Sequence, residues 1–152
     1  MIKIDKIDQE ILKLLQKNAE LTNKEIAASL KMSPTPIFER IKKLKKNGVI
    51  THFTAIIDRN KVGKDMLIFC NVIVKEHSEQ KLKKFEKEIR EIPEVTECFL
   101  ISGSADYLLK VIVENMPAYN DFLNKLSKFE NIGNTNSIMI LRQIKNDTRI
   151  PL

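Results

Sequence analysis

Residues 34–46 concentrate positive charge in a pattern that suits contact with an anion. Five basic side chains fall within seven residues: Arg40, Lys42, Lys43, Lys45 and Lys46. Between them Ile37, Ile41 and Leu44 recur at helical spacing, which predicts a helix that buries one apolar stripe and turns its charges outward. A basic helix face of this kind is either simply solvated or binds an anionic partner.

The ends of this helix are marked by residues that favour helix termini. Pro34 and Pro36 suit the first turn, because backbone N–H groups there have no partner inside the helix and proline loses nothing. Ser33 can cap the start with its hydroxyl, and Gly48 can end the helix. The sequence therefore predicts a helix from about residue 34 to residue 47.

Two shorter helices are expected before the basic helix. The first begins after Asp5 and carries an apolar stripe, and the second opens with a capping box between Thr22 and Glu25. Only residues 31–33 separate the second helix from the basic one. Three short helices with a tight final turn are typical of a helix-turn-helix domain, whose partner is double-stranded DNA.

The charge distribution favours the same partner. Residues 1–60 contain 12 Lys or Arg and 7 Asp or Glu, so they carry +5 of the total net charge of +6. A basic excess confined to one part of a chain indicates an anionic partner for that part. We therefore expect residues 1–50 to form a winged helix-turn-helix DNA-binding domain, followed by a connecting strand or hinge over residues 51–64.

The motif assigns roles along the basic helix. Its N-terminal residues meet base edges, so base contacts are predicted for Thr35, Pro36, Glu39 and Arg40. Arg40 suits guanine, Glu39 suits cytosine, and the Thr35 methyl suits thymine. Phosphate contacts are predicted for Ser33, Lys42, Lys43, Lys45 and Lys46. Phe38 flanks the buried stripe and is expected to join the core.

From residue 65 the pattern changes to alternating strands and helices. Strands are expected at 66–75, 95–102, 106–113 and 135–145, with helices at 79–92 and from Pro117. The order β-α-β-β-α-β is that of a ferredoxin-like domain, over residues 65–152. The whole chain is thus predicted to be an α+β protein with two domains.

Two of these strands are apolar on both faces. Residues 66–74 barely alternate, and Leu108 and Ile112 are apolar on the face opposite Leu109 and Val111. Two helices cover only one face of a sheet, and a large exposed apolar face usually marks an interface. We therefore expect a homodimer that forms through this domain.

Several classes of protein are not supported by the sequence. We find no nucleophile–base pair and no glycine-rich phosphate loop, and His52 and His77 are isolated, so no enzyme is expected. Cys70 and Cys98 are predicted to be free, buried thiols, and neither a metal nor a cofactor is expected. No apolar run approaches the roughly 18 residues of a membrane span, and no signal peptide is visible. A cytoplasmic protein without a membrane partner is predicted.

Three segments together resemble the Lrp/AsnC, or feast/famine, family of transcriptional regulators. They are "IDQEILKLLQKNAELTNKEIAASLKMSPTPIFERIKKLKKNGVI", "THFTAIIDRNKVG" and "CFLISGSADYLLKVIVENMPAYNDFL". The stretch "MSPTPIFERIKKLKKNGVI" and the late "KNDTRIPL" most resemble the leucine-responsive branch. The resemblance implies a sequence-specific regulator with a ligand-sensing domain, whose dimers assemble into tetramers, octamers or larger discs.

The resemblance also implies an effector, usually an amino acid or a related metabolite, at the turn between the second and third strands. Here that turn contributes Gly103, Ser104, Ala105, Asp106 and Tyr107, with Thr135 and Ser137 as further candidates. Gly103 lets a ligand approach the backbone, exposed N–H groups suit a carboxylate, and Asp106 suits an ammonium. Two alternatives stay open: a plain hairpin turn in which Asp106 is a local cap, and an architectural DNA-wrapping protein with no effector.

Overall fold

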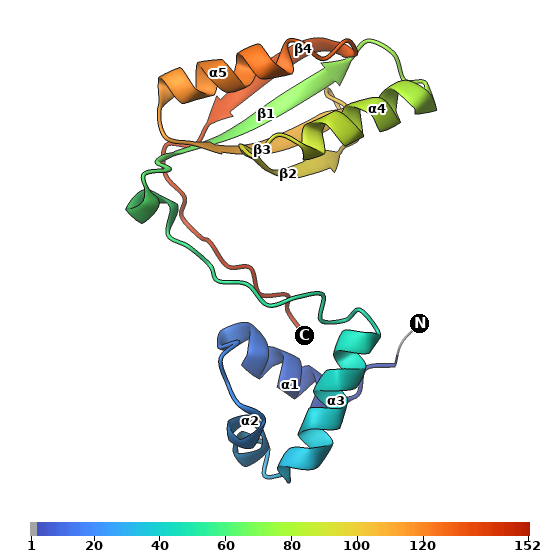
Figure 1. Ribbon diagram of the computed structural model, residues 1–152, viewed down its shortest axis with the longest axis vertical. Helices are drawn as coiled ribbons and strands as arrows, with labels where there is room; N and C mark the ends of the chain where they lie inside the picture. The colour runs from blue at the N-terminus through green and yellow to red at the C-terminus, as the bar shows by residue number, and fades with distance from the viewer. Residues whose placement is uncertain (1–2) are drawn as a thin grey trace. The chain divides into compact units, whose positions relative to one another are not determined.

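A computed structural model describes residues 3–152 of the chain (Figure 1). It divides into two compact units, one made of Met1–Ile56 with Lys145–Leu152 and the other of Ile57–Ile144. We expected residues 65–152 to stay together as one domain. By their contacts, the last eight residues instead group with the N-terminal unit.

The N-terminal unit contains α1 (Lys6–Lys17), α2 (Asn23–Ser29) and α3 (Pro34–Lys46), which is the predicted three-helix order. Each helix contributes to one apolar core, whose fully buried members include Ile11, Ile26 and Ile37. The predicted stripe of α3 is buried as expected, because Ile41 and Leu44 join Ile37 in this core. The basic side chains of α3 therefore point away from it.

Side-chain caps fix the starts of α1 and α2. Asp5 caps α1 and Thr22 caps α2, each in a reciprocal capping box with the residue three positions on. Ser33 also occupies the N-cap position of α3, but its side chain makes no capping hydrogen bond. Gly48, just beyond α3, has a φ of +70°, a conformation that favours glycine.

The C-terminal tail is tied to α1 by one glutamine side chain. The Ile150 N–H donates to Oε1 of Gln16 at 2.6 Å, and Nε2 of Gln16 donates to the Ile150 carbonyl at 3.1 Å. The amide thus pairs with the tail backbone as a neighbouring strand would. Ile150 and Leu152 line a groove together with Leu12, Leu15 and Val49.

The second unit begins with residues 57–58 and a short 3-10 helix, η1 (Arg59–Val62). It then contains β1 (Met66–Val74), α4 (Glu79–Arg90), β2 (Val95–Leu100), β3 (Tyr107–Val113), α5 (Met116–Leu126) and β4 (Ile132–Met139). The strands pair antiparallel in the order β2-β3-β1-β4. This is the predicted ferredoxin-like arrangement. No helix among residues 3–152 is long and apolar enough to cross a membrane.

Both helices cover the same face of the sheet (Figure 1). On that face Phe85 of α4 and Phe122 of α5 pack against buried strand residues such as Leu109 and Val111. The opposite face carries exposed apolar side chains, among them Ile73, Phe99 and Ile138. Apolar residues on both faces were predicted, and the structure shows that the second face is uncovered in a single chain.

Two details of the sheet differ from expectation. We expected the last strand at 135–145, but β4 spans Ile132–Met139, because its partner β1 pairs from Ile68 opposite Met139 to Val74 opposite Ile132. Beyond residue 140 the described part of the chain forms no further strand. Cys98 was expected to be buried, but it is exposed on the edge strand β2, whereas Cys70 is buried on the central strand β1.

Candidate functional site

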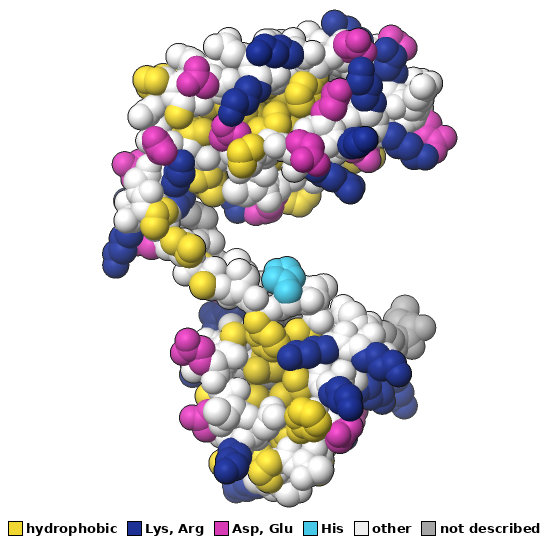
Figure 2. Space-filling model, in the orientation of Figure 1, with side chains coloured by type: hydrophobic (Ala, Val, Ile, Leu, Met, Phe, Trp, Pro, Cys, Tyr) yellow, Lys and Arg dark blue, Asp and Glu magenta, His cyan; other side chains and the backbone are white. Residues whose placement is uncertain are grey.

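The outward face of α3 carries most of the residues predicted to contact DNA. Thr35, Pro36 and Glu39 are exposed along its first two turns. Lys42, Lys43 and Lys46 are exposed further along, and Figure 2 shows dark-blue Lys and Arg side chains gathered over the C-terminal half of α3. One helix therefore presents Thr35, Pro36 and Glu39 at its start and cations at its end.

No carboxylate of the described residues neutralises these lysines. Among residues 3–152, none of the ion pairs within 4.0 Å involves Lys42, Lys43 or Lys46. The Ser33 hydroxyl is likewise exposed and unused as a cap. Unpaired cations and a spare hydroxyl on one surface suit the oxygen atoms of a phosphate backbone.

Arg40 differs from the lysines, because its guanidinium is already bound. Its Nη1 atom lies 2.7 Å from Oδ2 of Asp5 and 2.7 Å from Oδ1 of Asp8. These hydrogen bonds to Asp5 and Asp8 raise the pKa of Arg40. The pKa of Asp5 is lowered, first by the Asp8 backbone N–H and then by Arg40. The arginine that was predicted to read a base thus joins α3 to the start of α1.

Phe38 was expected in the core, and this expectation was wrong. The residue is 49% exposed and is absent from the apolar cluster of the N-terminal unit. It directly follows Ile37, and one residue along a helix rotates a side chain by about 100° away from the buried stripe. The Nζ atom of Lys42, one turn later, lies 6.0 Å from the centre of its ring.

The turn that leads to β3 is open at its tip. Gly103 and Ser104 are exposed, and Gly103 has a φ of +145°. A Cβ at Gly103 meets nothing within 4 Å, so the backbone conformation rather than crowding favours glycine there. Ala105 is buried, with 8% of its surface exposed. A ligand can reach this turn at Gly103 and Ser104.

Both carboxylate oxygens of Asp106 already have partners. Oδ2 accepts from the Val74 N–H at 2.8 Å, and Oδ1 lies 2.7 Å from Nε2 of His77. These contacts, first that of Val74 and then that of His77, lower the pKa of Asp106. Asp106 therefore acts as a local cap that joins the turn to the end of β1. The sequence suggested that His77 is isolated. In the structure it contacts Asp106 instead, although its side chain is 67% exposed.

The remaining effector candidates lie under the helices rather than at the tip of the turn. Tyr107 is 1% exposed, and its hydroxyl donates to Glu86 of α4 at 3.1 Å. Thr135 and Tyr107 pair with Val72 from opposite sides of β1. The Ser137 hydroxyl is hydrogen-bonded to that of Tyr119. Gly103, Ser104 and Asp106 thus lie on the turn before β3, whereas Thr135 and Ser137 lie on β4, on the other side of β1.

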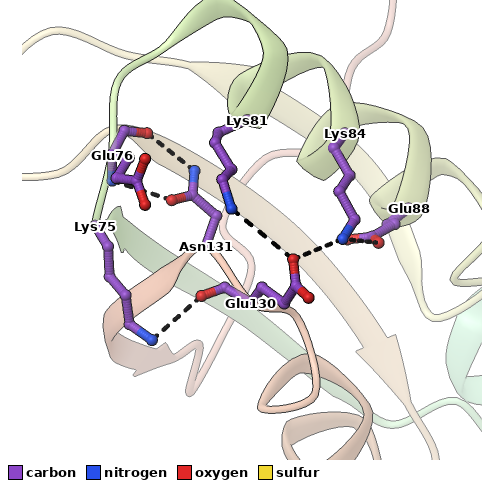
Figure 3. Close-up of polar contacts among 7 residues, drawn as sticks. All are labelled: Lys75, Glu76, Lys81, Lys84, Glu88, Glu130 and Asn131. Carbon is purple, nitrogen blue, oxygen red and sulfur yellow. Dashed lines mark hydrogen bonds and ion pairs between the residues drawn. The ribbon is translucent and has the colours of Figure 1, made fainter.

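A polar cluster holds the loop before β4 at the end of β1 (Figure 3). Asn131 is 7% exposed, and its side chain bonds both the N–H and the carbonyl of Glu76 at 3.0 Å. Glu130 binds Lys84 of α4 at 2.7 Å and lies 3.9 Å from Lys81. Neither Asn131 nor His77 was predicted to have a role, because their partners lie 55 and 29 residues away.

The acidic, cysteine and histidine residues do not form a metal centre in the part of the chain that is described. No group of three or more of these side chains within residues 3–152 is placed to hold a metal ion. The two features of the site that stand out are therefore the cationic face of α3 and the open turn at Gly103.

Comparison with known proteins agrees with this geometry. Residues 4–51 match a winged helix-turn-helix DNA-binding domain, and residues 67–150 match the Lrp/AsnC ligand binding domain. The chain belongs to the Lrp/AsnC family. It is accordingly a DNA-binding transcriptional regulator of the Lrp/AsnC type, as the sequence indicated.

Relatives match it over nearly their whole length. The leucine-responsive regulatory protein of Rhizobium meliloti is 32% identical over 152 residues, which cover 99% of this chain and 97% of that protein. The solved transcriptional regulator NMB0573 of Neisseria meningitidis, in complex with L-Met, is 30% identical with a TM-score of 0.93, covering 98% of this chain and 97% of that chain. AsnC of E. coli is 26% identical with a TM-score of 0.90, covering 99% and 100%.

Proposed function

We propose that this member of the family binds specific DNA sites by placing α3 in the major groove. The observation that carries the proposal is the exposed face of α3, where Lys42, Lys43 and Lys46 have no carboxylate partner among the described residues. Cations of this kind neutralise phosphates and position the protein on the duplex. Ser33 adds a hydroxyl to the same phosphate contacts.

Base reading falls to the exposed residues at the start of α3. Thr35, Pro36 and Glu39 occupy the positions that meet base edges in this motif. Arg40 was expected beside them, but its two ion pairs favour a positioning role in which it holds α3 against α1. In that role the position of Arg40 is set by its contacts with α1 rather than by contacts with DNA.

The uncovered sheet face supports a homodimer. This face meets water in a single chain. The side chains of Ile73, Phe99 and Ile138 on it are between 39% and 48% exposed. A second copy packed sheet against sheet removes this apolar area from water in both chains. Two DNA-binding units per dimer then match a palindromic site, and further association into tetramers, octamers or larger discs adds more such units.

The effector that we propose is an amino acid bound at the open turn. Its carboxylate meets backbone N–H groups near Gly103 and Ser104, and its ammonium meets Oδ1 of Asp106. The ammonium takes the place of His77 on that oxygen, and His77 is exposed enough to move away. The complex of NMB0573 with L-Met supports an amino acid as the class of ligand. The protein works in the cytoplasm, as a regulator and not as an enzyme.

The first experiment is a pull-down of sheared genomic DNA by the purified chain, followed by sequencing. Sharp, roughly palindromic peaks are expected, because a dimer with two recognition helices requires two half-sites. A flat profile that follows A·T content contradicts sequence-specific reading and favours an architectural DNA-wrapping protein. An absence of enrichment contradicts DNA binding by α3.

The effector is tested separately by thermal unfolding with each amino acid in turn. A ligand that binds the folded state raises the unfolding midpoint of the second unit. We expect Asp106→Asn to remove this shift, since the amide still accepts from the Val74 N–H but no longer attracts an ammonium. Asp121→Asn, on the exposed face of α5, is the matched control and should keep the shift. No shift with any amino acid contradicts this class of effector without affecting the DNA result.

A further inference from the structure

Phe38 is a large apolar side chain on the surface that α3 presents outward. It is 49% exposed, although α3 has a well-filled apolar stripe one residue away. Its ring joins no apolar cluster among the described residues of the N-terminal unit. Leaving a phenylalanine half in water gives up part of the stabilisation that its burial would provide, so the fold of this unit alone does not account for it.

The charges around Phe38 restrict what can cover it. Lys42 lies one turn away with its Nζ atom 6.0 Å from the ring centre, and Lys45 and Lys46 follow on the same helix. A second copy docked on this surface through the same helix would bring two sets of lysines together, which is unfavourable. A polyanion would remove that repulsion, because its phosphates can bind Lys42 beside the ring and the lysines that follow it on α3.

The start of α3 is also poor in hydrogen-bond donors. Two of its first three residues, Pro34 and Pro36, have no backbone N–H. The surface that precedes Phe38 therefore offers apolar area more than it offers donors. In the major groove one base edge is apolar, and it is the C5-methyl group of thymine.

We infer that Phe38 is a specificity-determining residue, which contacts the C5-methyl group of a thymine in the major groove. The inference rests on the proposed function, because it assumes that α3 enters that groove. The inference adds a base contact by Phe38, for which the sequence predicted no contact with DNA. The contact explains the exposure of the ring in free protein, since the thymine methyl and the ring leave water together on binding.

The test replaces each thymine of a strongly bound site, one at a time, with deoxyuridine, which lacks only the methyl group. Affinity is measured by fluorescence anisotropy at one salt concentration, for the full-length chain and for Phe38→Ala. We expect one thymine in each half-site whose replacement weakens the wild-type complex by about fourfold, the value of about one buried methyl group. In Phe38→Ala the same replacement should have no further effect.

Three variants show whether the deoxyuridine effect depends on the ring of Phe38 in particular. Thr35→Ser removes the only methyl group that Thr35 offers, and should leave the thymine read by Phe38 as sensitive as before. Phe53→Ala removes an aromatic ring that is similarly exposed, at 45%, and lies against Lys45, and it should also keep the sensitivity. Phe38→Leu keeps an apolar side chain at this position and should retain part of the sensitivity to deoxyuridine. Thermal unfolding checks that each variant is folded.

Each result decides the inference. Loss of the deoxyuridine effect in Phe38→Ala, with its retention in Thr35→Ser and Phe53→Ala, supports it. An equal deoxyuridine effect in Phe38→Ala and wild type overturns it while leaving the proposed function intact. A wild-type protein that prefers particular sites but responds to deoxyuridine at no position overturns it in the same way. A wild-type protein that prefers no site overturns the proposed function as well.

Discussion

The Nη1 atom of Arg40 lies 2.7 Å from Oδ1 of Asp8, so that an ion pair joins the third helix to the first. Asp8 is buried, with 9% of its surface exposed, and Arg40 also contacts Asp5 at the N-cap of α1. A charge pair that is largely removed from water is costly to break on one side only. The pair therefore joins α1 to α3 beside the exposed face that we propose contacts DNA.

We predict that Arg40→Ala weakens binding to all DNA sequences together and lowers the stability of the N-terminal unit by about 1–3 kcal/mol. Both effects follow from the loss of the Arg40–Asp8 ion pair that joins α3 to α1. Urea unfolding followed by circular dichroism gives the stability, and binding to a set of single-base variants gives the preference. Asp8→Asn, which leaves α3 unchanged, should show the same pattern. If Arg40→Ala relaxes preference at one base position and Asp8→Asn does not, Arg40 reads a base.

The lysines of α3 should act on the salt dependence of binding. We predict that Lys43→Ala reduces the slope of log affinity against log salt by about 0.9 for each α3 bound, and so by about 1.8 for the proposed dimer, because each Lys43 neutralises one phosphate. All sequences should weaken alike, because a phosphate carries no sequence information. Lys13→Ala is the control, since Lys13 is paired with Glu10 at 2.8 Å on α1. An unchanged slope in Lys43→Ala means that its ammonium does not meet a phosphate.

Local signals explain how much of this architecture the sequence predicts. The start of α1 after Asp5, the capping box at Thr22 and the stripe around Ile41 involve residues within a few positions of one another, and all of them were predicted. The order of strands and helices was predicted for the same reason. Each of these features depends on spacing that a reader of the sequence can count.

The parts that could not be predicted depend on contacts between distant residues. From the sequence Arg40 is predicted to be free to contact a base, because its partners Asp5 and Asp8 lie 35 and 32 positions away. Asp106 reads as free because His77 lies 29 positions away. The exposure of Phe38 depends on which neighbours fail to cover it, and the end of β4 depends on the length of β1. Helical or strand periodicity contains none of this information.

The attachment of the C-terminal tail should depend on Gln16. We predict that Gln16→Leu makes the backbone amide of Ile150 exchange its hydrogen about tenfold faster. The variant loses two hydrogen bonds, each worth roughly 1 kcal/mol or less. Gln16→Glu is the matched control, since it keeps the acceptor for the Ile150 N–H and loses only the amide donor. Amide exchange followed by NMR measures both. Unchanged exchange in Gln16→Leu means that apolar contacts of Ile150 and Leu152 hold the tail.

The buried phenol of Tyr107 should make the second unit sensitive to alkali. Burial first, and then the hydrogen bond to Glu86, raise the pKa of Tyr107 from 10.0 to about 12. The folded state thus favours the neutral phenol. Its contribution is fully present below pH 10.0, the ordinary pKa, and is lost as the pH rises towards 12, because the unfolded chain releases the proton first.

We therefore predict that the free energy of unfolding falls by about 2 kcal/mol more in wild type than in Tyr107→Phe over this range, at 1.4 kcal/mol per pKa unit. Urea unfolding followed by circular dichroism at several pH values measures the difference, and the lysines titrate equally in both proteins. Tyr107→Phe keeps the ring that packs 4.6 Å from Phe85, so its core should remain filled. Parallel losses in the two proteins mean that the Tyr107 phenolate is accommodated in the fold.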